Sequence, residues 1–173
     1  MSRELSLLDH ALLGLLNRGD ASGYELRKVF SQTPLGRFSD SPGSIYPALQ
    51  RLERRGFVAG SRPTGARRRR TLHLTAAGRR AFTEWVLAPA AASDTERDDG
   101  AFELRLAFMS DVAPRRLRAF LDEHAEALDA RHDRVAAAVQ GLRDKLSPSA
   151  LLAVDLGLHA MRARSSWCRR ATV

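Results

Sequence analysis

The chain has 173 residues, of which 44% are hydrophobic, and a formal net charge of +8. This length suits one domain or two small ones, each able to bury a core. The single cysteine, Cys168, excludes an intrachain disulfide, and the sequence shows neither the pattern of a signal peptide nor an uninterrupted apolar run of membrane-spanning length. We therefore expect a cytoplasmic protein that does not enter a membrane.

The excess positive charge lies in the N-terminal half. Residues 1–90 hold 15 Lys and Arg against 7 Asp and Glu, whereas residues 91–173 hold 13 of each. Nine arginines and no acidic residue lie between Glu53 and Glu84. A genome-wide preference for arginine would raise the charge of both halves, so the local excess favours a polyanionic partner over a merely solvated surface.

Two helices are expected before residue 40. Leucines at three- and four-residue spacing predict a first helix from about Leu5 to Gly19, where glycine favours a helix end. The segment Ser22-Gly23-Tyr24-Glu25 has the pattern of a capping box, in which a Ser hydroxyl and a Glu carboxylate bind the unpaired amides of a helix start. A second helix therefore begins there, and Pro34 and Gly36 end it.

The start of the third helix depends on two prolines. If Pro42 were its first residue, Pro47 would lie inside the helix, at a cost of about 3 kcal/mol. If Ser44 is the N-cap instead, Pro47 falls in the first turn, where no helical amide bond is lost. We therefore expect this helix to run from near Ser44 to Gly56. The residues left on its outer faces are Gln50, Arg51, Arg54 and Arg55.

A basic β-hairpin should follow the third helix. Phe57–Ala59 and Thr71–Leu74 have the composition of short strands, and Pro63-Thr64-Gly65 between them predicts a turn. Thr75 then caps a fourth helix that ends near Pro89. Three helices followed by such a hairpin are typical of a winged helix-turn-helix, so we assign residues 1–89 to a DNA-binding domain and residues 90–100 to a linker.

The C-terminal half is expected to be helical. Pro114 can open a long helix that reaches about Lys145, and a second apolar helix should begin at Ser147-Pro148. Apolar residues repeat every seven positions in the first and cover several faces of the second, which predicts a coiled-coil-like dimerisation domain over residues 101–173. The candidate interface residues are Leu121, Leu128, Val135, Leu142, Leu158 and Met161. The fold class is therefore mainly α, with a two-stranded β-wing.

Three segments form a recognisable set, namely residues 23–26 (GYEL), residues 41–53 (SPGSIYPALQRLE) and residues 74–79 (LTAAGR). Together they resemble the PadR family of transcriptional regulators. The resemblance implies a winged-helix repressor that dimerises through its C-terminal helices and is released by a small-molecule effector. The wing departs from the family pattern, because Arg67 to Leu72 keep the charge but lack the aromatic residues usual there.

The residues expected to contact DNA lie on the third helix and the wing. Ser44 and Tyr46 can donate hydroxyls to phosphate, and Gln50, Arg51 and Arg54 can reach bases or the backbone. The alternatives are that Ser44 only caps the helix and that Tyr46 packs into the core. The wing arginines Arg67, Arg68, Arg69 and Arg70 should bind backbone or minor groove, unless they form a solvated loop.

Further site hypotheses concern the two tryptophans, two histidines and Cys168. The resemblance implies an effector pocket near the dimer seam that uses Trp85 and Trp167, although we favour the alternative that both are core or dimer-packing residues. His124 and His132 lack further ligands at metal spacing, so no metal site or cofactor is expected. Arginines beside Cys168 could lower its thiol pKa and allow a redox role, against the alternative of a passive thiol. No catalytic motif is present, and we expect no enzyme.

The expected function is sequence-specific binding of an operator by a homodimeric regulator. Two-fold symmetry would match a pseudo-palindromic operator in double-stranded DNA. A MarR-like dimer is a rival, although that family usually has dimerisation helices at both ends. Two further alternatives are a helical adaptor that binds RNA or acidic protein through its basic half, and a ligand-binding protein with a degenerate DNA-binding domain.

Overall fold

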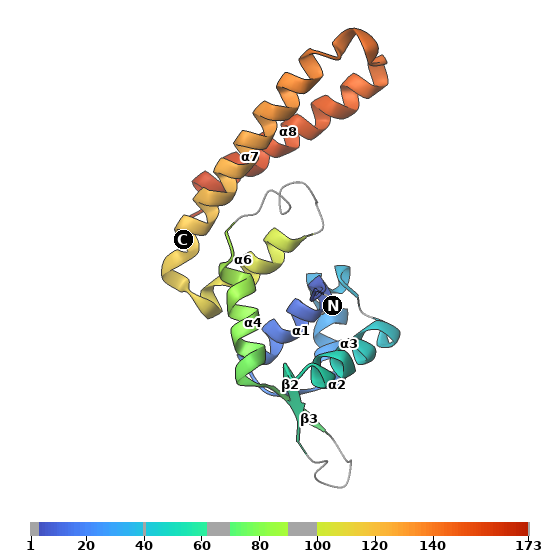
Figure 1. The fold of residues 1–173 in the computed structure, drawn as a ribbon, viewed down its shortest axis with the longest axis vertical. Coiled ribbons are helices and arrows are strands. Elements are labelled where there is room, and N and C mark those ends of the chain that lie inside the picture. The colour runs from blue at the N-terminus through green and yellow to red at the C-terminus, as the bar shows by residue number, and fades with distance from the viewer. Residues whose placement is uncertain (1–3, 40, 62–69, 90–99, 173) are drawn as a thin grey trace. The chain divides into compact units, whose positions relative to one another are not determined.

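The computed structural model describes residues 4–39, 41–61, 70–89 and 100–172 (Figure 1). The chain packs as two compact units, each of which is discontinuous in sequence. The first comprises Met1–Leu87 with Glu103–Val112, and the second comprises Ala88–Phe102 with Ala113–Val173. Among the described residues, no helix has the length and hydropathy that a membrane span requires.

The helices at the start of the first unit begin at side-chain caps. They are α1 (Leu7–Arg18), α2 (Gly23–Gln32) and the 3-10 turn η1 (Pro34–Arg37). The predicted capping box of α2 is confirmed, because Ser22 Oγ accepts from Glu25 N and Glu25 accepts from Ser22 N. A second box, between Ser6 and Asp9, starts α1 slightly later than expected. Both boxes satisfy amides that a helix start leaves unpaired.

Helix α3 (Pro42–Arg54) begins earlier than expected. Its N-cap is Ser41, whose Oγ accepts from Gly43 N at 3.2 Å, so the prediction of a start near Ser44 was wrong. Pro47 lies inside the helix and removes the bond that residue 47 would otherwise donate to the carbonyl of Gly43. That carbonyl belongs to the exposed first turn, where water can reach it. Hydration of the carbonyl therefore limits the free-energy cost of Pro47 inside the helix.

A small antiparallel sheet separates α3 from α4 (Ala76–Leu87) along the chain. Strand β3 (Thr71–Leu74) matches the predicted strand, and it pairs with β2 (Val58–Gly60), in which Val58 lies opposite Leu74. A third strand, β1 (Ala21–Ser22), pairs with the other edge of β3 and was not predicted. Two residues are too few to show a strand pattern. The predicted turn at 63–65 lies outside the described residues.

Part of helix α6 (Ala101–Val112) completes the core of the first unit. Phe108 is buried, and its ring meets the ring of Phe82 edge-on with 5.5 Å between the centroids. Close packing extends to Gly14 on α1, where an added Cβ would lie 2.5 Å from Phe108 Cζ. Residues 103–112, which the sequence analysis placed with the C-terminal helices, therefore pack with the winged-helix elements.

The second unit is built around a helical hairpin. Helices α7 (Leu117–Gln140) and α8 (Pro148–Arg170) lie side by side in opposite directions (Figure 1). The cap of α8 is as predicted, since Ser147 Oγ accepts from Ala150 N at 3.2 Å. Helix α7 ends at Gln140 and not near Lys145, because the chain needs the intervening residues, including the 3-10 turn η3 (Arg143–Lys145), to turn into α8. Leu142, the last residue of the predicted stripe, consequently lies outside the helix and is exposed.

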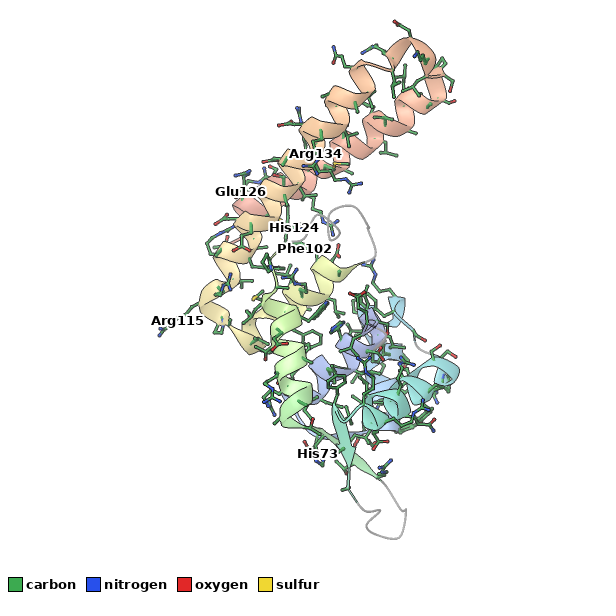
Figure 2. The ribbon with its side chains drawn as sticks, in the orientation of Figure 1. His73, Phe102, Arg115, His124, Glu126 and Arg134 are labelled. Atoms are coloured by element: carbon green, nitrogen blue, oxygen red, sulfur yellow. The ribbon has the colours of Figure 1, made fainter. Side chains whose placement is uncertain are left out.

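The interior of this unit includes a stack of aromatic rings at the start of α7. The ring of Phe102 lies 3.7 Å from that of His124 and 5.4 Å from that of Phe120, nearly parallel to both. Figure 2 shows Phe102 and His124 against each other. Leu121 and Leu128 are also buried within this single chain. Two of the predicted dimer residues are therefore already covered without a partner subunit.

Candidate nucleic-acid interface

The outer face of α3 presents three polar side chains in a row. Tyr46, Gln50 and Arg54 follow one another at four-residue spacing and are all exposed. Residues four apart lie on the same side of a helix, so the three form one stripe. The opposite side packs into the core through buried Ile45, Ala48, Leu49 and Leu52. Burial of that side fixes the helix so that the polar stripe faces outward.

Ser44 lies in the exposed first turn of α3. Its backbone N–H donates to the carbonyl of Ser41 at 3.0 Å, and the capping role that the sequence analysis allowed for Ser44 belongs to Ser41. The hydroxyl of Ser44 is therefore not needed as the cap. It lies beside the unpaired amides and positive dipole end of the helix, where an anion is favoured.

Tyr46 is partly packed and partly open. Tyr46 is 40% exposed. Its ring lies against Gly23, where an added Cβ would be only 2.9 Å from Tyr46 Cε1. Together with Gln50 and Arg70, these residues line a surface hollow of about 190 Å³. Gly23 thus allows the Tyr46 ring to lie close to the start of α2, a function that the sequence analysis did not assign to this glycine.

Arg51 is engaged with the core side of the domain. Its Nη2 lies 2.6 Å from Asp9 Oδ1, and the Asp9 side chain is 2% exposed. The other carboxylate oxygen of Asp9 accepts from Ser6 N at 2.9 Å. The arginine that was expected to reach base edges is therefore held against α1. The pair was not predicted, although an acidic residue inside a leucine-rich helix was a signal for it.

Arg70 joins the wing to α3. It forms a two-bond ion pair with Glu53, with Nη1 to Oε2 at 2.9 Å and Nη2 to Oε1 at 2.7 Å. The guanidinium lies directly over Gly60 on β2, where an added Cβ would be 2.3 Å from Arg70 Nε. Arg70 therefore has a structural contact as well as a position next to the stripe. The other predicted wing residues, Arg67, Arg68 and Arg69, lie outside the described part of the chain.

The two tryptophans belong to different units. Trp85 stacks on His10 in the first unit, with 4.0 Å between ring centroids and a 12° interplanar angle. Burial lowers the pKa of His10 to about 4, although nearby Asp9 opposes the shift, so this histidine is neutral at pH 7. Trp167 is on α8 in the second unit and is 49% exposed. Trp85 thus has the packing role that the sequence analysis gave as its alternative.

The remaining candidates are structural in character. His132 lies 3.0 Å from Asp133, and the ranges that the structure describes contain no group of three potential metal ligands. Cys168 is fully buried, and burial raises the pKa of its thiol in spite of the nearby arginines. The idea of an activated thiol is therefore wrong, because reactivity requires the thiolate.

The comparisons with known proteins agree with the resemblance seen in the motifs. Residues 12–84 match the model of the transcriptional regulator PadR-like family. They form a PadR-like domain. Over 157 residues the chain is 26% identical to the negative transcriptional regulator PadR of Bacillus subtilis, and the alignment covers 88% of this chain and 84% of that one. The matched proteins are transcriptional regulators and not enzymes.

Solved structures of PadR-type regulators are also among the matches. The crystal structure of Bacillus subtilis PadR in complex with operator DNA has a TM-score of 0.45 at 23% identity and covers 94% of this chain and 96% of that one. The complex of the same protein with p-coumaric acid has a TM-score of 0.45 at 22% identity, with 97% and 94% covered. The PadR-like match in this chain spans the α3 stripe and the Arg70–Glu53 pair.

Proposed function

We propose that the chain is a homodimeric repressor that binds an operator in double-stranded DNA and is released by a small-molecule effector. The observation that carries this proposal is the exposed stripe of Tyr46, Gln50 and Arg54 on α3 of a PadR-like domain. A helix that presents three donors outward, beside a basic β-hairpin, has the groups needed to enter a major groove.

The side chains of the stripe suit different parts of DNA. Gln50 can make two hydrogen bonds to one adenine, and Arg54 can bind guanine or phosphate. Ser44 and Tyr46 can donate hydroxyls to phosphate oxygens near the helix N-terminus. In this proposal Arg51 positions α3 through Asp9 and does not read bases.

The wing supplies backbone affinity. Arg70 is 51% exposed in its side chain and can share its charge between Glu53 and a phosphate. Arg67, Arg68 and Arg69 extend the same basic run in sequence, and their excess charge favours DNA for any base sequence. Specificity is thus assigned to α3 and general affinity to the wing.

Dimerisation is proposed to use the outer face of α8. Leu152 and Leu156 lie one helical turn apart and are 70% and 72% exposed, and half-exposed Trp167 follows further along the helix. Large apolar side chains in a row on a surface mark a contact site. Leu142 at the hairpin turn and the half-buried Val135, Leu158 and Met161 remain candidates for the same contact. A two-fold dimer would present two α3 helices to two half-sites.

The proposal is tested by selecting bound duplexes from a random DNA library with the purified protein. We expect the selected sequences to converge on two half-sites related by two-fold symmetry, and the protein to elute with the mass of a dimer. Leu156→Glu should give monomers and single half-sites, whereas Glu126→Gln, an exposed change on α7, should leave the mass unchanged. Selected sequences without any common motif would contradict the proposal and favour a non-specific basic adaptor.

A further inference from the structure

The small surface hollow beside Tyr46 lies between α3, the start of α2 and strand β3, all within the first unit. Its volume of about 190 Å³ is below the range of small-molecule sites. Tyr46 and Gln50 of the exposed α3 stripe both line it, so the hollow opens beside the side chains that we propose to read DNA. This size and position suit a small group of the DNA itself better than a separate molecule.

Much of the lining of the hollow is apolar. Leu49 of α3 and Leu72 of β3 belong to it and are only 4% and 5% exposed, so they offer a hydrocarbon surface that is otherwise packed into the core. The ring of Tyr46 adds to this surface. Gly23 has no side chain that could fill the space, and an added Cβ there would lie 2.9 Å from Tyr46 Cε1 and 3.4 Å from Leu49 Cδ1. An apolar group that enters the hollow exchanges water for hydrocarbon, which is favourable.

The charged groups of the hollow are paired with each other. Glu53 and Arg70 line it, and their two-bond ion pair offsets one charge with the other. The Glu53 carboxylate repels an anion that enters the hollow, whereas a phosphate outside it can still reach the half-exposed Arg70. The hollow therefore favours an uncharged occupant.

Gln50 links the hollow to the reading of bases. Its side chain is exposed on α3 and also lines the hollow. A glutamine amide can bind N6 and N7 of one adenine in the major groove. Successive bases of one strand are about 3.4 Å apart along the helix axis, so a group on the base pair that Gln50 binds, or on its neighbour, lies within reach of the hollow.

The base edges in the major groove present one apolar group, the C5-methyl of thymine, among groups that donate or accept hydrogen bonds. We infer that the hollow receives the C5-methyl group of an operator thymine, and that Gly23 determines this specificity by keeping the hollow open. The inference rests on the proposed function, because it names a part of the operator that α3 reads.

The methyl contact is tested on a duplex from the library selection, in which each thymine is replaced in turn by deoxyuridine. Deoxyuridine keeps the hydrogen-bonding groups of thymine and lacks only the methyl group. We expect a position in each half-site at which the replacement weakens binding about fourfold, since an apolar group of this size contributes roughly that factor when it leaves water. The scan uses the unchanged protein, so it does not depend on the folding of a variant. An affinity that stays the same after every replacement would overturn the inference.

Gly23→Ala tests whether this hollow holds the methyl group. The added Cβ forces the Tyr46 ring to move, and the lining of the hollow changes with it. We expect the ratio of the affinities for the thymine and deoxyuridine duplexes to fall from about four to about one. Gly19→Ala is the matched change, since nothing lies within 4 Å of its Cβ, and it should leave the ratio unchanged. Circular dichroism melting checks that both variants are folded. A ratio that stays at its original value in folded Gly23→Ala would place the methyl contact elsewhere and contradict the inference.

Failure of the methyl contact and failure of the proposed function give different results. A selection that yields no common motif contradicts the proposed function and the methyl contact with it. A selected duplex that binds equally well after every replacement contradicts the methyl contact alone and leaves operator binding by α3 intact.

Discussion

The guanidinium of Arg51 on α3 lies 2.6 Å from the carboxylate of Asp9 on α1, and that carboxylate is almost completely buried. Asp9 also closes the capping box of its own helix with Ser6. One acidic side chain thus both starts α1 and holds the outward-facing helix α3. A buried carboxylate that loses its partner is costly, so the pair links the stability of the fold to the position of the proposed DNA-reading stripe.

Arg51→Met should destabilise the protein because it leaves the Asp9 carboxylate buried without its cation. We expect the free energy of unfolding to fall by about 2 kcal/mol, less than for a fully buried pair since the Arg51 side chain is 37% exposed. Arg54→Met, three residues later on the exposed face, should change it by less than about 0.5 kcal/mol. Urea unfolding measures both free energies. Similar decreases for the two variants would show that the Arg51–Asp9 pair does not stabilise the fold.

His10 should make stability depend on pH. Its pKa in the folded protein is lowered to about 4 from an ordinary 6.5, mainly by burial. The unfolded chain therefore binds the proton more tightly, and the stabilising contribution is full above about pH 6.5 and is lost as the pH falls toward 4. The loss should be about 3 kcal/mol relative to His10→Phe, which keeps a ring against Trp85. Parallel pH profiles of the two proteins would refute this assignment.

Gly78→Ala should be destabilising although alanine is the better helix former. An added Cβ at Gly78 would lie 2.0 Å from the carbonyl oxygen of Phe57, and a backbone atom cannot move aside cheaply. We expect a loss of about 1 to 3 kcal/mol in the free energy of unfolding. Gly157→Ala on α8 is the matched change, since nothing lies within 4 Å of its Cβ, and it should be neutral or stabilising by up to about 1 kcal/mol. Thermal unfolding of both variants separates the two effects, and a stabilising Gly78→Ala would be inconsistent with the packing described.

Glu53→Gln should strengthen binding to duplexes of any base sequence. The change removes the anion that pairs with Arg70, so the guanidinium becomes fully available to phosphate. We expect the slope of log affinity against log salt to steepen by about one unit. Glu126→Gln makes the same charge change on α7 in the second unit and should leave the slope as it is. An unchanged slope for Glu53→Gln would mean that Arg70 has no phosphate contact.

Local patterns in the sequence were sufficient for most elements of the first unit. The capping box at Ser22 and strand β3 agree with the structure, and the PadR-like resemblance is confirmed by the family model. Ser44 was taken as the start of α3 because propensity penalises Pro47 inside a helix. Burial of the opposite side of the helix, including Ile45, outweighs that penalty, and such tertiary packing cannot be read from local rules.

The sequence predicted which residues of the candidate site are exposed better than it predicted their ion-pair partners. Gln50 and Arg54 are exposed as expected, whereas Arg51 and Arg70 are held by Asp9 and Glu53. Both pairs join segments that are distant in sequence, so helical spacing gave no sign of them. A seven-residue repeat likewise predicts an apolar face but not what covers it, and Leu121 and Leu128 are already buried within this single chain.

The most direct test of DNA reading by α3 is equilibrium binding of the purified protein to the DNA upstream of its own gene, against a shuffled duplex of equal length, over a salt series. Our account predicts a preference for the upstream duplex that persists near physiological salt and that Gln50→Ala reduces by about 1 to 3 kcal/mol. It also predicts that Gln50→Ala leaves binding to the shuffled duplex unchanged. The contradicting result is equal affinity for both duplexes, falling steeply for each as the salt concentration rises. It would mean that this DNA is not recognised specifically and that the arginines supply only general electrostatic attraction.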